Sequence, residues 1–422
     1  MKILVIGGGG REHALVWKLR QSPRVTEIFC APGNAGIGRI ATNVPIPIGD
    51  QSSLVKFANA AGIDLVVVGP DDALAAGIVD RFQQAGLRIF GPTQSAARLE
   101  SSKVFAKAFM KRHGIPTAAS GHFSDASEAH RFCQQMQYPA VIKADGLALG
   151  KGVVIAQNPW EAAEAIHAIM ERRQFGAAGD SVVIEEFLTG QECSVHALVD
   201  GSNYLLFPTA QDHKQIFDGD RGPNTGGMGT FSPPAKLVTP EVEARIHKEI
   251  MEPFMAGLAK DGLEFRGMLF PGVMVTAEGP KVLEFNCRFG DPETQALVTR
   301  LKSDLVDLLE RTVEGRLDGA EPEWDSRAAV CVVMASGGYP GDYVAGKPIT
   351  GIEEAEATPE VVVFHAGTKQ VEGKLVTGGG RVLGVTALGA DLAAAQAKAY
   401  EAVGKIDFEG ATFRRDIAAK GL

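Results

Sequence analysis

The sequence has few cysteines and no long apolar runs. Its five cysteines lie at positions 30, 133, 193, 287 and 331, and no two of them form a C-x-x-C pair. No apolar run approaches the ~18 residues needed to span a bilayer, and the N-terminus has no signal-peptide pattern. These absences exclude a disulfide scaffold. They predict a cytoplasmic location, reduced core cysteines and no membrane partner.

Zinc-binding histidine patterns and an excess of positive charge are also missing. None of the nine histidines forms H-x-H or H-E-x-x-H, which argues against a zinc site. No G-x-S-x-G motif is present, so a serine nucleophile elbow is excluded. The formal net charge of −9 argues against a surface that wraps nucleic acid. We therefore expect small-molecule partners and no nucleic acid.

Glycine, in contrast, is abundant and clustered, with 50 residues among 422. The first hundred residues alternate strand and helix, and each strand ends in a glycine turn. The predicted strands are Lys2–Ile6, Val25–Cys30, Ile63–Val68 and Leu87–Phe90. This rhythm predicts an open parallel α/β sheet. Such sheets bind ligands at the carboxyl ends of their strands, so the glycine turns are the expected site of this domain.

The chain is too long for one hydrophobic core, since single cores stop growing near ~250–300 residues. We predict an N-terminal parallel α/β domain over residues 1–102 and a middle domain over 103–320, with a smaller lobe at about 120–192. A C-terminal α+β domain is expected over 328–422, so the fold class is multidomain α/β and α+β. Segment Asp218–Gly229 holds five glycines and few apolar residues, which predicts a mobile loop.

The stretch after Leu283 carries the strongest chemical signal. Residues two apart share a face of a strand, so Glu284 and Asn286 project the same way and Arg288 follows in phase. Two oxygen ligands beside a guanidinium suit Mg²⁺ that carries nucleotide phosphates. The alternative is a strand with scattered surface polar residues. That alternative is the weaker one, because Arg288 continues the two-residue spacing of Glu284 and Asn286.

The first glycine turn fails the dinucleotide-binding pattern. G-x-G-x-x-G from Gly7 or Gly8 would need glycine where Glu12 or His13 stands. The second strand also lacks a terminal acid for an adenine ribose. Backbone amides at a helix N-terminus and Arg11 still suit a small phosphorylated substrate. A purely structural turn is the alternative.

A second glycine loop, residues 145–152, fails the Walker pattern because it lacks glycine at 145 and Ser or Thr at 152. It joins two predicted strands, so it reads as a hairpin flap over phosphates, with Lys143 just before it. The strand that ends at Glu186 runs into Thr189-Gly190, with Glu192 beyond. Such a hinge offers backbone groups to an adenine edge and a carboxylate to ribose hydroxyls.

These pieces resemble the ATP-grasp superfamily of carboxylate–amine ligases and, within it, the glycinamide ribonucleotide synthetase family. The resemblance runs over nearly the whole chain. The motifs that carry it are Gly9-Gly10-Arg11-Glu12-His13, Ala31-Pro32-Gly33-Asn34-Ala35-Gly36, Lys143-Ala144-Asp145-Gly146, Gln211-Asp212-His213-Lys214, Gly222-Pro223-Asn224-Thr225-Gly226-Gly227 and Arg288-Phe289-Gly290-Asp291-Pro292-Glu293-Thr294-Gln295.

The resemblance implies a pre-ATP-grasp N-terminal domain, a two-lobed ATP-grasp domain and a set of site residues. Mg²⁺ or Mn²⁺ would lie on Glu284 and Asn286, and Arg288, Asp212 and Lys143 would be catalytic. ATP would contact Lys103, Lys143, Gly150, Lys151, Gly152, Glu185, Glu186, Leu188 and Glu192. Substrates would contact Gly9, Gly10, Arg11, Glu12, Gly33, Asn34, Asp212, Asn224, Gly226 and Arg288.

The implied reaction joins glycine to 5-phosphoribosylamine through glycyl phosphate. Its products are glycinamide ribonucleotide, ADP and phosphate, in de novo purine synthesis. One alternative is another ATP-grasp ligase of purine metabolism that uses formate or bicarbonate. Two others from different classes are a nucleotide-sugar dehydrogenase and a catalytically dead nucleotide sensor. A monomer or weak homodimer is expected.

Overall fold

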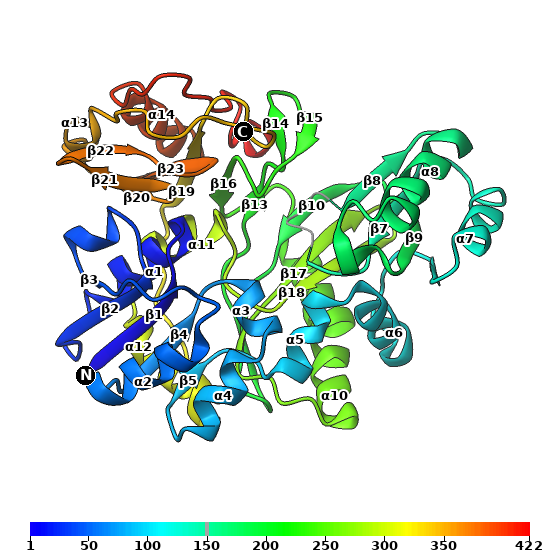
Figure 1. Ribbon diagram of the computed structural model, residues 1–422, viewed down its shortest axis with the longest axis horizontal. Helices are drawn as coiled ribbons and strands as arrows, with labels where there is room; N and C mark the ends of the chain where they lie inside the picture. The colour runs from blue at the N-terminus through cyan, green and yellow to red at the C-terminus, as the bar shows by residue number, and fades with distance from the viewer. Residues whose placement is uncertain (148–151) are drawn as a thin grey trace.

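The computed structural model describes residues 1–147 and 152–422, which form three domains. In Figure 1 the N-terminal domain is blue, the C-terminal domain is orange to red and lies above it, and the lobe with α7 and α8 projects to the right. An open parallel sheet at the N-terminus and antiparallel sheets elsewhere confirm the predicted fold class. The predicted phosphate contacts at Gly150 and Lys151 lie outside the described residues.

The N-terminal domain is a parallel sheet of order β3-β2-β1-β4-β5 flanked by helices. Its strands are β1 (Lys2–Gly7), β2 (Glu27–Pro32), β3 (Thr42–Asn43), β4 (Leu65–Val68) and β5 (Ile89–Phe90). Its helices are α1 (Gly10–Leu19), α2 (Gln51–Ala61), α3 (Asp71–Ala75), α4 (Ile78–Gln84) and α5 (Gln94–Ser101). β1 and β4 are buried on both faces, which explains their continuous apolar sequences.

Helix α6 (Lys103–His113) leads into the small lobe, an antiparallel sheet of order β6-β9-β7-β8. The lobe contains β6 (Ser120–Phe123), β7 (Ala140–Ala144), β8 (Val153–Ala156), β9 (Val182–Glu186), α7 (Ala126–Cys133) and α8 (Pro159–Ile166). Strands β7 and β8 form the predicted hairpin, and Ala144 N donates to Gly152 O at 2.8 Å. The hairpin pairing is as the sequence predicted, while residues 148–151 of the predicted flap lie outside the described residues.

The large lobe is a second antiparallel sheet, of order β10-β17-β11-β12 with β18 paired to β17. Its strands are β10 (Gln191–Ser194), β11 (Ala197–Val199), β12 (Tyr204–Leu206), β17 (Gly267–Thr276) and β18 (Gly279–Asn286). Its helices are α9 (Pro240–Arg245), α10 (Glu252–Asp261), α11 (Glu293–Arg300) and α12 (Leu305–Glu314). Gly272 pairs with Glu284 and Phe270 with Asn286, so the β17–β18 pairing fixes the end of β18.

The C-terminal domain has a sheet of order β13-β16-β19-β23-β20. It contains β19 (Ala328–Ala335), β20 (Val361–His365), β23 (Arg381–Gly389), α13 (Ile352–Glu356), α14 (Leu392–Val403) and the hairpin β21 (Thr368–Val371) to β22 (Lys374–Thr377). Two of its sheet strands, β13 (Gln211–Asp212) and β16 (Gly229–Ser232), come from far earlier in the chain. The C-terminal domain therefore shares a sheet with the segment that bears Asp212.

The segment predicted as a mobile loop, Asp218–Gly229, contains regular structure. β14 (Gln215–Phe217) and β15 (Arg221–Asn224) form a two-stranded sheet, labelled beside the C-terminus in Figure 1. Arg414 holds it, because Nη1 donates to Gln215 O at 3.1 Å and to Asp220 Oδ1 at 2.9 Å. The expectation of an irregular loop was wrong for Arg221–Asn224, because the support comes from Arg414, almost 200 positions away; the mobility of the segment stays a prediction.

All five cysteines lie in the described residues, and each is buried and free, as the sequence predicted. Among the helices of the described residues, none has both the length and the apolar content for a membrane span.

The large lobe provides a test of its core. Phe254 in α10 is fully buried and packs against the rings of Phe109, Phe265 and Phe285. We expect Phe254→Ala to lower the free energy of unfolding by about 3–5 kcal/mol, because the cavity adds to the lost burial. Phe217→Ala is the matched control, since that ring is 55% exposed and should cost about 0.5 kcal/mol or less. If denaturant unfolding showed the same loss of free energy of unfolding in both variants, the placement of Phe254 in the core would be contradicted.

Candidate functional site

The end of β18 brings together the three residues that the sequence singled out. Arg288 Nη2 donates to Asn286 Oδ1 at 3.2 Å, and the Glu284 side chain lies nearby with 38% of its surface exposed. The alternate residues Phe285, Cys287 and Phe289 are buried on the opposite side, as alternation predicted. This edge therefore carries two oxygen donors and a guanidinium.

Arg288 is paired with a carboxylate that sequence reasoning missed. Its Nε lies 3.1 Å from Glu100 Oε1, and Glu100 Oε2 accepts a hydrogen bond of 2.7 Å from Cys287 N. Burial raises the pKa of Glu100 to about 7, although Arg288 opposes this shift. Glu100 lies at the end of α5, about 190 residues before Arg288, and no local sequence signal marks it. The pair holds the guanidinium in place at the strand end.

Lysine side chains surround Glu284. Lys214 forms an ion pair with Glu192, and its Nζ lies 4.0 Å from Glu284 Oε1. Burial raises the pKa of Glu284, but attraction from Lys214, Lys143, Lys103 and Arg288 outweighs burial and lowers the pKa below its usual value. Burial likewise lowers the pKa of Lys214, while Glu192 and Glu284 raise it above its usual value. The carboxylate and the ammonium therefore both stay charged at neutral pH.

The base of the small lobe holds two buried lysines on one carboxylate. Glu185 Oε2 lies 3.0 Å from Lys143 Nζ, and Oε1 lies 3.1 Å from Lys107 Nζ. Lys143 Nζ also donates to Leu283 O at 3.3 Å, beside Glu284. Sequence reasoning assigned Glu185 to adenine or ribose and did not assign Lys107. The carboxylate of Glu185 orients the two lysines here, so its backbone remains the part that can meet a base edge.

The other predicted ATP contacts lie around this cluster. Lys103 Nζ donates to Gly146 O at 2.9 Å, and burial lowers the pKa of its ammonium. Glu186 is exposed and accepts a hydrogen bond of 2.9 Å from Ala119 N. Leu188 is buried, and it lies at the predicted hinge between the lobes. Lys103, Lys143 and the hinge therefore line the junction of the small and large lobes.

Glu284 and Asn286 fit a divalent cation that is shared with phosphates. Mg²⁺ and Mn²⁺ prefer oxygen ligands, and protein Mg²⁺ sites commonly use one or two carboxylates plus substrate phosphates. A Cβ on Gly272 would lie 3.6 Å from Glu284 Cγ and 3.7 Å from Glu192 Oε1, so both side chains lie over the Gly272 backbone of β17. Within the described residues no group of three or more His, Cys, Asp or Glu is placed to hold a metal. The carboxylate of Glu284 and the amide oxygen of Asn286, two residues apart on β18, are the kinds of oxygen ligand that fit such a metal.

Asp212 faces a second carboxylate across the site. Burial is the main cause of its raised pKa, and repulsion from Glu293 adds to it. Ser194 Oγ donates to Glu293 Oε1 at 2.9 Å, while Asp212 Oδ1 is buried without a hydrogen-bond partner among the described residues. Two close carboxylates, one with an unused buried oxygen, suit a small cation such as an ammonium group.

The first glycine turn is built around Glu12. Glu12 Oε2 accepts from Gly9 N at 2.6 Å and Oε1 from Arg11 Nε at 2.5 Å, and the residue is 2% exposed. Arg11 Nη1 donates to Phe289 O at 3.3 Å, which joins this turn to the strand end that bears Arg288. A Cβ on Gly10 would lie 2.7 Å from Gln295 Nε2, so α1 approaches α11 closely. Glu12 thus positions Arg11.

A cavity of about 620 Å³ separates this turn from the C-terminal domain. Gly33 and Asn34 line one side, as the predicted substrate contacts require, and Arg39 lies beside them. The other side is formed by Ala366–Gln370, a range that includes Lys369. Asn34 Nδ2 donates to Gly8 O at 2.9 Å and to His365 O at 2.8 Å, so it links the two domains at the cavity. The cavity is large enough for a sugar phosphate.

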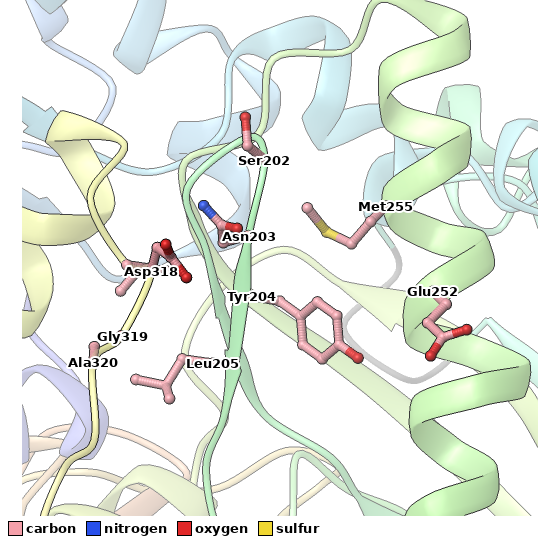
Figure 2. Close-up of a pocket in the computed structure, with 10 residues that line it drawn as sticks. Ser202, Asn203, Tyr204, Leu205, Glu252, Met255, Asp318, Gly319 and Ala320 are labelled. Atoms are coloured by element: carbon pink, nitrogen blue, oxygen red, sulfur yellow. The ribbon is translucent and has the colours of Figure 1, made fainter.

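Another cavity, of about 390 Å³, lies between α10, the β11–β12 turn and the segment after α12. Figure 2 shows Tyr204 and Glu252 at its edge, with Asp318 opposite. Its lining, in the described part of the chain, includes none of the residues that the sequence predicted for the site. We therefore place the chemistry elsewhere.

The predicted contacts Asn224 and Gly226 lie beside the C-terminal domain. Asn224 pairs with Gln215 in the β14–β15 hairpin, and Gly226 N donates to Tyr339 Oη at 3.0 Å. Sequence reasoning missed Arg381, which contacts Gly226 from β23. Three glycines, at residues 378–380, precede Arg381, but no local pattern marks it as a partner of Gly226.

Comparison with known proteins decides the family. Models of the phosphoribosylglycinamide synthetase N domain, ATP-grasp (A) domain and C domain match residues 1–100, 101–294 and 329–420. This chain belongs to the phosphoribosylglycinamide synthetase family. A phosphoribosylamine–glycine ligase of Allochromatium vinosum is 52% identical over 425 residues, covering 100% of this chain and 99% of that protein.

Solved structures agree with this family assignment. A phosphoribosylamine–glycine ligase of Thermotoga maritima has a TM-score of 0.87 and 37% identity, over 99% of this chain and 100% of that chain. A biotin carboxylase of Campylobacter jejuni has a TM-score of 0.74 at 15% identity, over 98% and 92% of the two chains. That second likeness shows the fold alone.

The metal assignment is testable at Glu284. We expect Glu284→Gln to lower turnover by about 100-fold or more, because it removes the charge that holds the cation and its phosphates. Turnover should be measured against Mg²⁺ concentration. Glu278→Gln is the matched control, since Glu278 lies in the β17–β18 turn, is exposed and has a carboxylate that pairs with Lys281. Normal turnover of Glu284→Gln at low Mg²⁺ would refute the assignment.

The Arg288–Glu100 pair gives a second test. We expect Arg288→Ala mainly to lower kcat, since the charge opposite Arg288 develops during phosphoryl transfer. Because the change leaves Glu100 buried without its partner, it should also lower the melting temperature. Adding Glu100→Gln should recover much of that stability but not kcat. A rise confined to the KM for ATP would reassign Arg288 to ground-state binding.

Proposed function

We propose that this chain uses ATP to join glycine to 5-phosphoribosylamine through glycyl phosphate. The products are glycinamide ribonucleotide, ADP and phosphate, in purine biosynthesis. The observation that carries the proposal is the β18 edge, where Glu284 and Asn286 lie beside Arg288 and the lysine cluster in a chain of this family. A carboxylate is a poor acyl donor until its oxygen becomes a phosphate leaving group, so the enzyme must first bring two anions together.

The activation step needs positive charge around the transferred phosphoryl group. Lys103 and Lys143 hold the ATP phosphates, and Arg288 stabilises the charge that develops on the acyl phosphate. Mg²⁺, or Mn²⁺, on Glu284 and Asn286 supplies further charge neutralisation at the phosphates when it is bound. Asp212, next to Glu293, binds the glycine ammonium and so orients its carboxylate. Support comes from the convergence of these groups, since Lys143, Lys103 and Arg288 all act on the charge of Glu284.

The acyl-transfer step needs the sugar amine close to the acyl phosphate and water kept away. The cavity between the N- and C-terminal domains, lined by Gly8, Gly33 and Asn34, binds 5-phosphoribosylamine, and the turn at Gly9–Glu12 follows Gly8 directly. Arg11 connects this turn to Phe289, one residue after Arg288, so the two substrates meet near the end of β18. Closure of the small lobe over the nucleotide excludes the water that would hydrolyse glycyl phosphate.

The alternatives receive less support. Relatives that are identical at about half of their positions are named for the glycine ligase, which does not favour an enzyme for formate or bicarbonate. The Glu12 carboxylate accepts a hydrogen bond from the backbone N–H of Gly9 in the first glycine turn. In a dinucleotide-binding dehydrogenase the corresponding turn binds the pyrophosphate, which disfavours that class. Lys143, Glu284, Asn286 and Arg288 are all present, which disfavours a dead sensor. A cytoplasmic location, supported by five free buried cysteines, and a monomer or weak homodimer remain predictions.

The direct test is ADP release by the purified protein with Mg-ATP, glycine and 5-phosphoribosylamine generated in situ. Each component is omitted in turn, and we expect release to need all three. Formate and bicarbonate replace glycine as controls. Release that ignores glycine but responds to another small carboxylate would overturn the substrate, and no release under any combination would favour the sensor.

A further inference from the structure

One arginine of the C-terminal domain reaches into the ATP-grasp domain. Arg381, the first residue of β23, donates from Nη1 to Gly226 O at 2.5 Å and to Asp291 O at 2.8 Å. Its Nη2 lies 3.0 Å from Asp291 Oδ2. A Cβ on Gly226 would lie 3.1 Å from Arg381 Cζ, so the guanidinium packs directly on the turn backbone. Arg381 thus joins two segments that sequence reasoning assigned to substrates.

A second residue of the same domain holds the same turn. Tyr339, in the segment after β19, accepts a hydrogen bond of 3.0 Å from Gly226 N. The peptide groups of Gly226 are therefore held on both sides, with the N–H on Tyr339 and the carbonyl on Arg381. Thr225 N donates to Lys214 O at 2.7 Å. The turn is therefore bonded to Lys214, whose side chain lies beside Glu192 and Glu284.

The turn Thr225–Gly227 lies against Asp212. A Cβ on Gly227 would be 2.9 Å from Asp212 Oδ1 and 3.0 Å from Oδ2. Gly227 has φ +109°, a conformation that glycine adopts readily and other residues do not. Gly227 N donates to Thr225 Oγ1 at 3.0 Å, which links the two ends of the turn. A shift of the turn would therefore change the space around the Asp212 carboxylate, where Oδ1 is buried and has no hydrogen-bond partner in the described residues.

We propose that Arg381 and Tyr339 are positioning residues through which the C-terminal domain sets the affinity of the ATP-grasp domain for glycine. The inference rests on the proposed function, because Asp212 binds the glycine ammonium in that mechanism. The contacts of Arg381 Nη1 and Nη2 go to Gly226 and Asp291, which assigns these two nitrogens to holding the turn. In the proposed mechanism ATP contacts Lys103 and Lys143, to which neither Arg381 nor Tyr339 is hydrogen-bonded, so the affinity for ATP should change little.

The test measures KM for glycine, KM for ATP, kcat and melting temperature in Tyr339→Phe, Arg381→Lys and the double variant. Tyr339→Phe keeps the ring but removes the acceptor for Gly226 N, so KM for glycine should rise about two- to tenfold. Arg381→Lys keeps the positive charge beside Asp291 but loses the fork that spans two carbonyls, so the rise should be about tenfold or more. Because both residues hold one turn, the double variant should show less than the product of the two effects.

Arg327→Lys is the matched control. Arg327 belongs to the same sheet region and pairs with Asp325 at 2.7 Å and Glu360 at 3.1 Å, away from the turn. It should leave the KM for glycine unchanged. If Arg381 and Tyr339 only stabilise the fold, their variants should have a lower melting temperature and a smaller active fraction, with an unchanged KM for glycine. That result would overturn the proposal. Wild-type turnover that needs no glycine would instead refute the proposed function, and the inference with it.

Discussion

A guanidinium buried at the end of a strand has to be compensated, and this requirement organises the site. Arg288 is held by Glu100 from the N-terminal side of the chain and by Asn286 from its own strand. Removing one member of the Arg288–Glu100 ion pair would leave the other charge without its partner in a low-dielectric surrounding, which costs far more than a surface ion pair contributes. The pairing fixes the strand end, and the strand end in turn fixes where Glu284 lies among Lys214, Lys143 and Lys103. Chemistry between anions needs such a set of cations before the substrates arrive.

All three domains meet just beyond that strand end. The Asp291 carboxylate contacts Arg381 of the C-terminal domain, and Gln295 Nε2 of α11 donates to it at 2.8 Å. Burial raises the pKa of Asp291, but Arg381 and Arg11 outweigh burial and keep it below the usual value. Asp291 is therefore an anion shared by cations from two other domains. This arrangement couples the N-terminal turn, the phosphate site and the turn over Asp212 through one buried charge.

Much of the fold was readable from local patterns. The first strands and their glycine turns, the β7–β8 hairpin and the strand that bears Glu284 and Asn286 were predicted, because burial and alternation leave a period in the sequence. The β14–β15 hairpin was not, because glycine and proline in Arg221–Asn224 give it no strand signal and Arg414 supplies its support. Glu100 and Lys107 were missed for a related reason, since a charged residue on a helix looks like a solvated one until its distant partner is known.

The sequence by itself determined the family, the types of side chain available for phosphate and metal chemistry, and the face of β18 on which they lie. Tertiary structure alone decided which charges pair. Only the tertiary structure shows that Glu185 forms ion pairs with two lysines and that Glu12 accepts a hydrogen bond from Arg11. It alone also shows that β13 and β16 belong to the sheet of the C-terminal domain. The physical reason is range: strand alternation acts between neighbours, whereas charge compensation and sheet pairing join residues hundreds of positions apart.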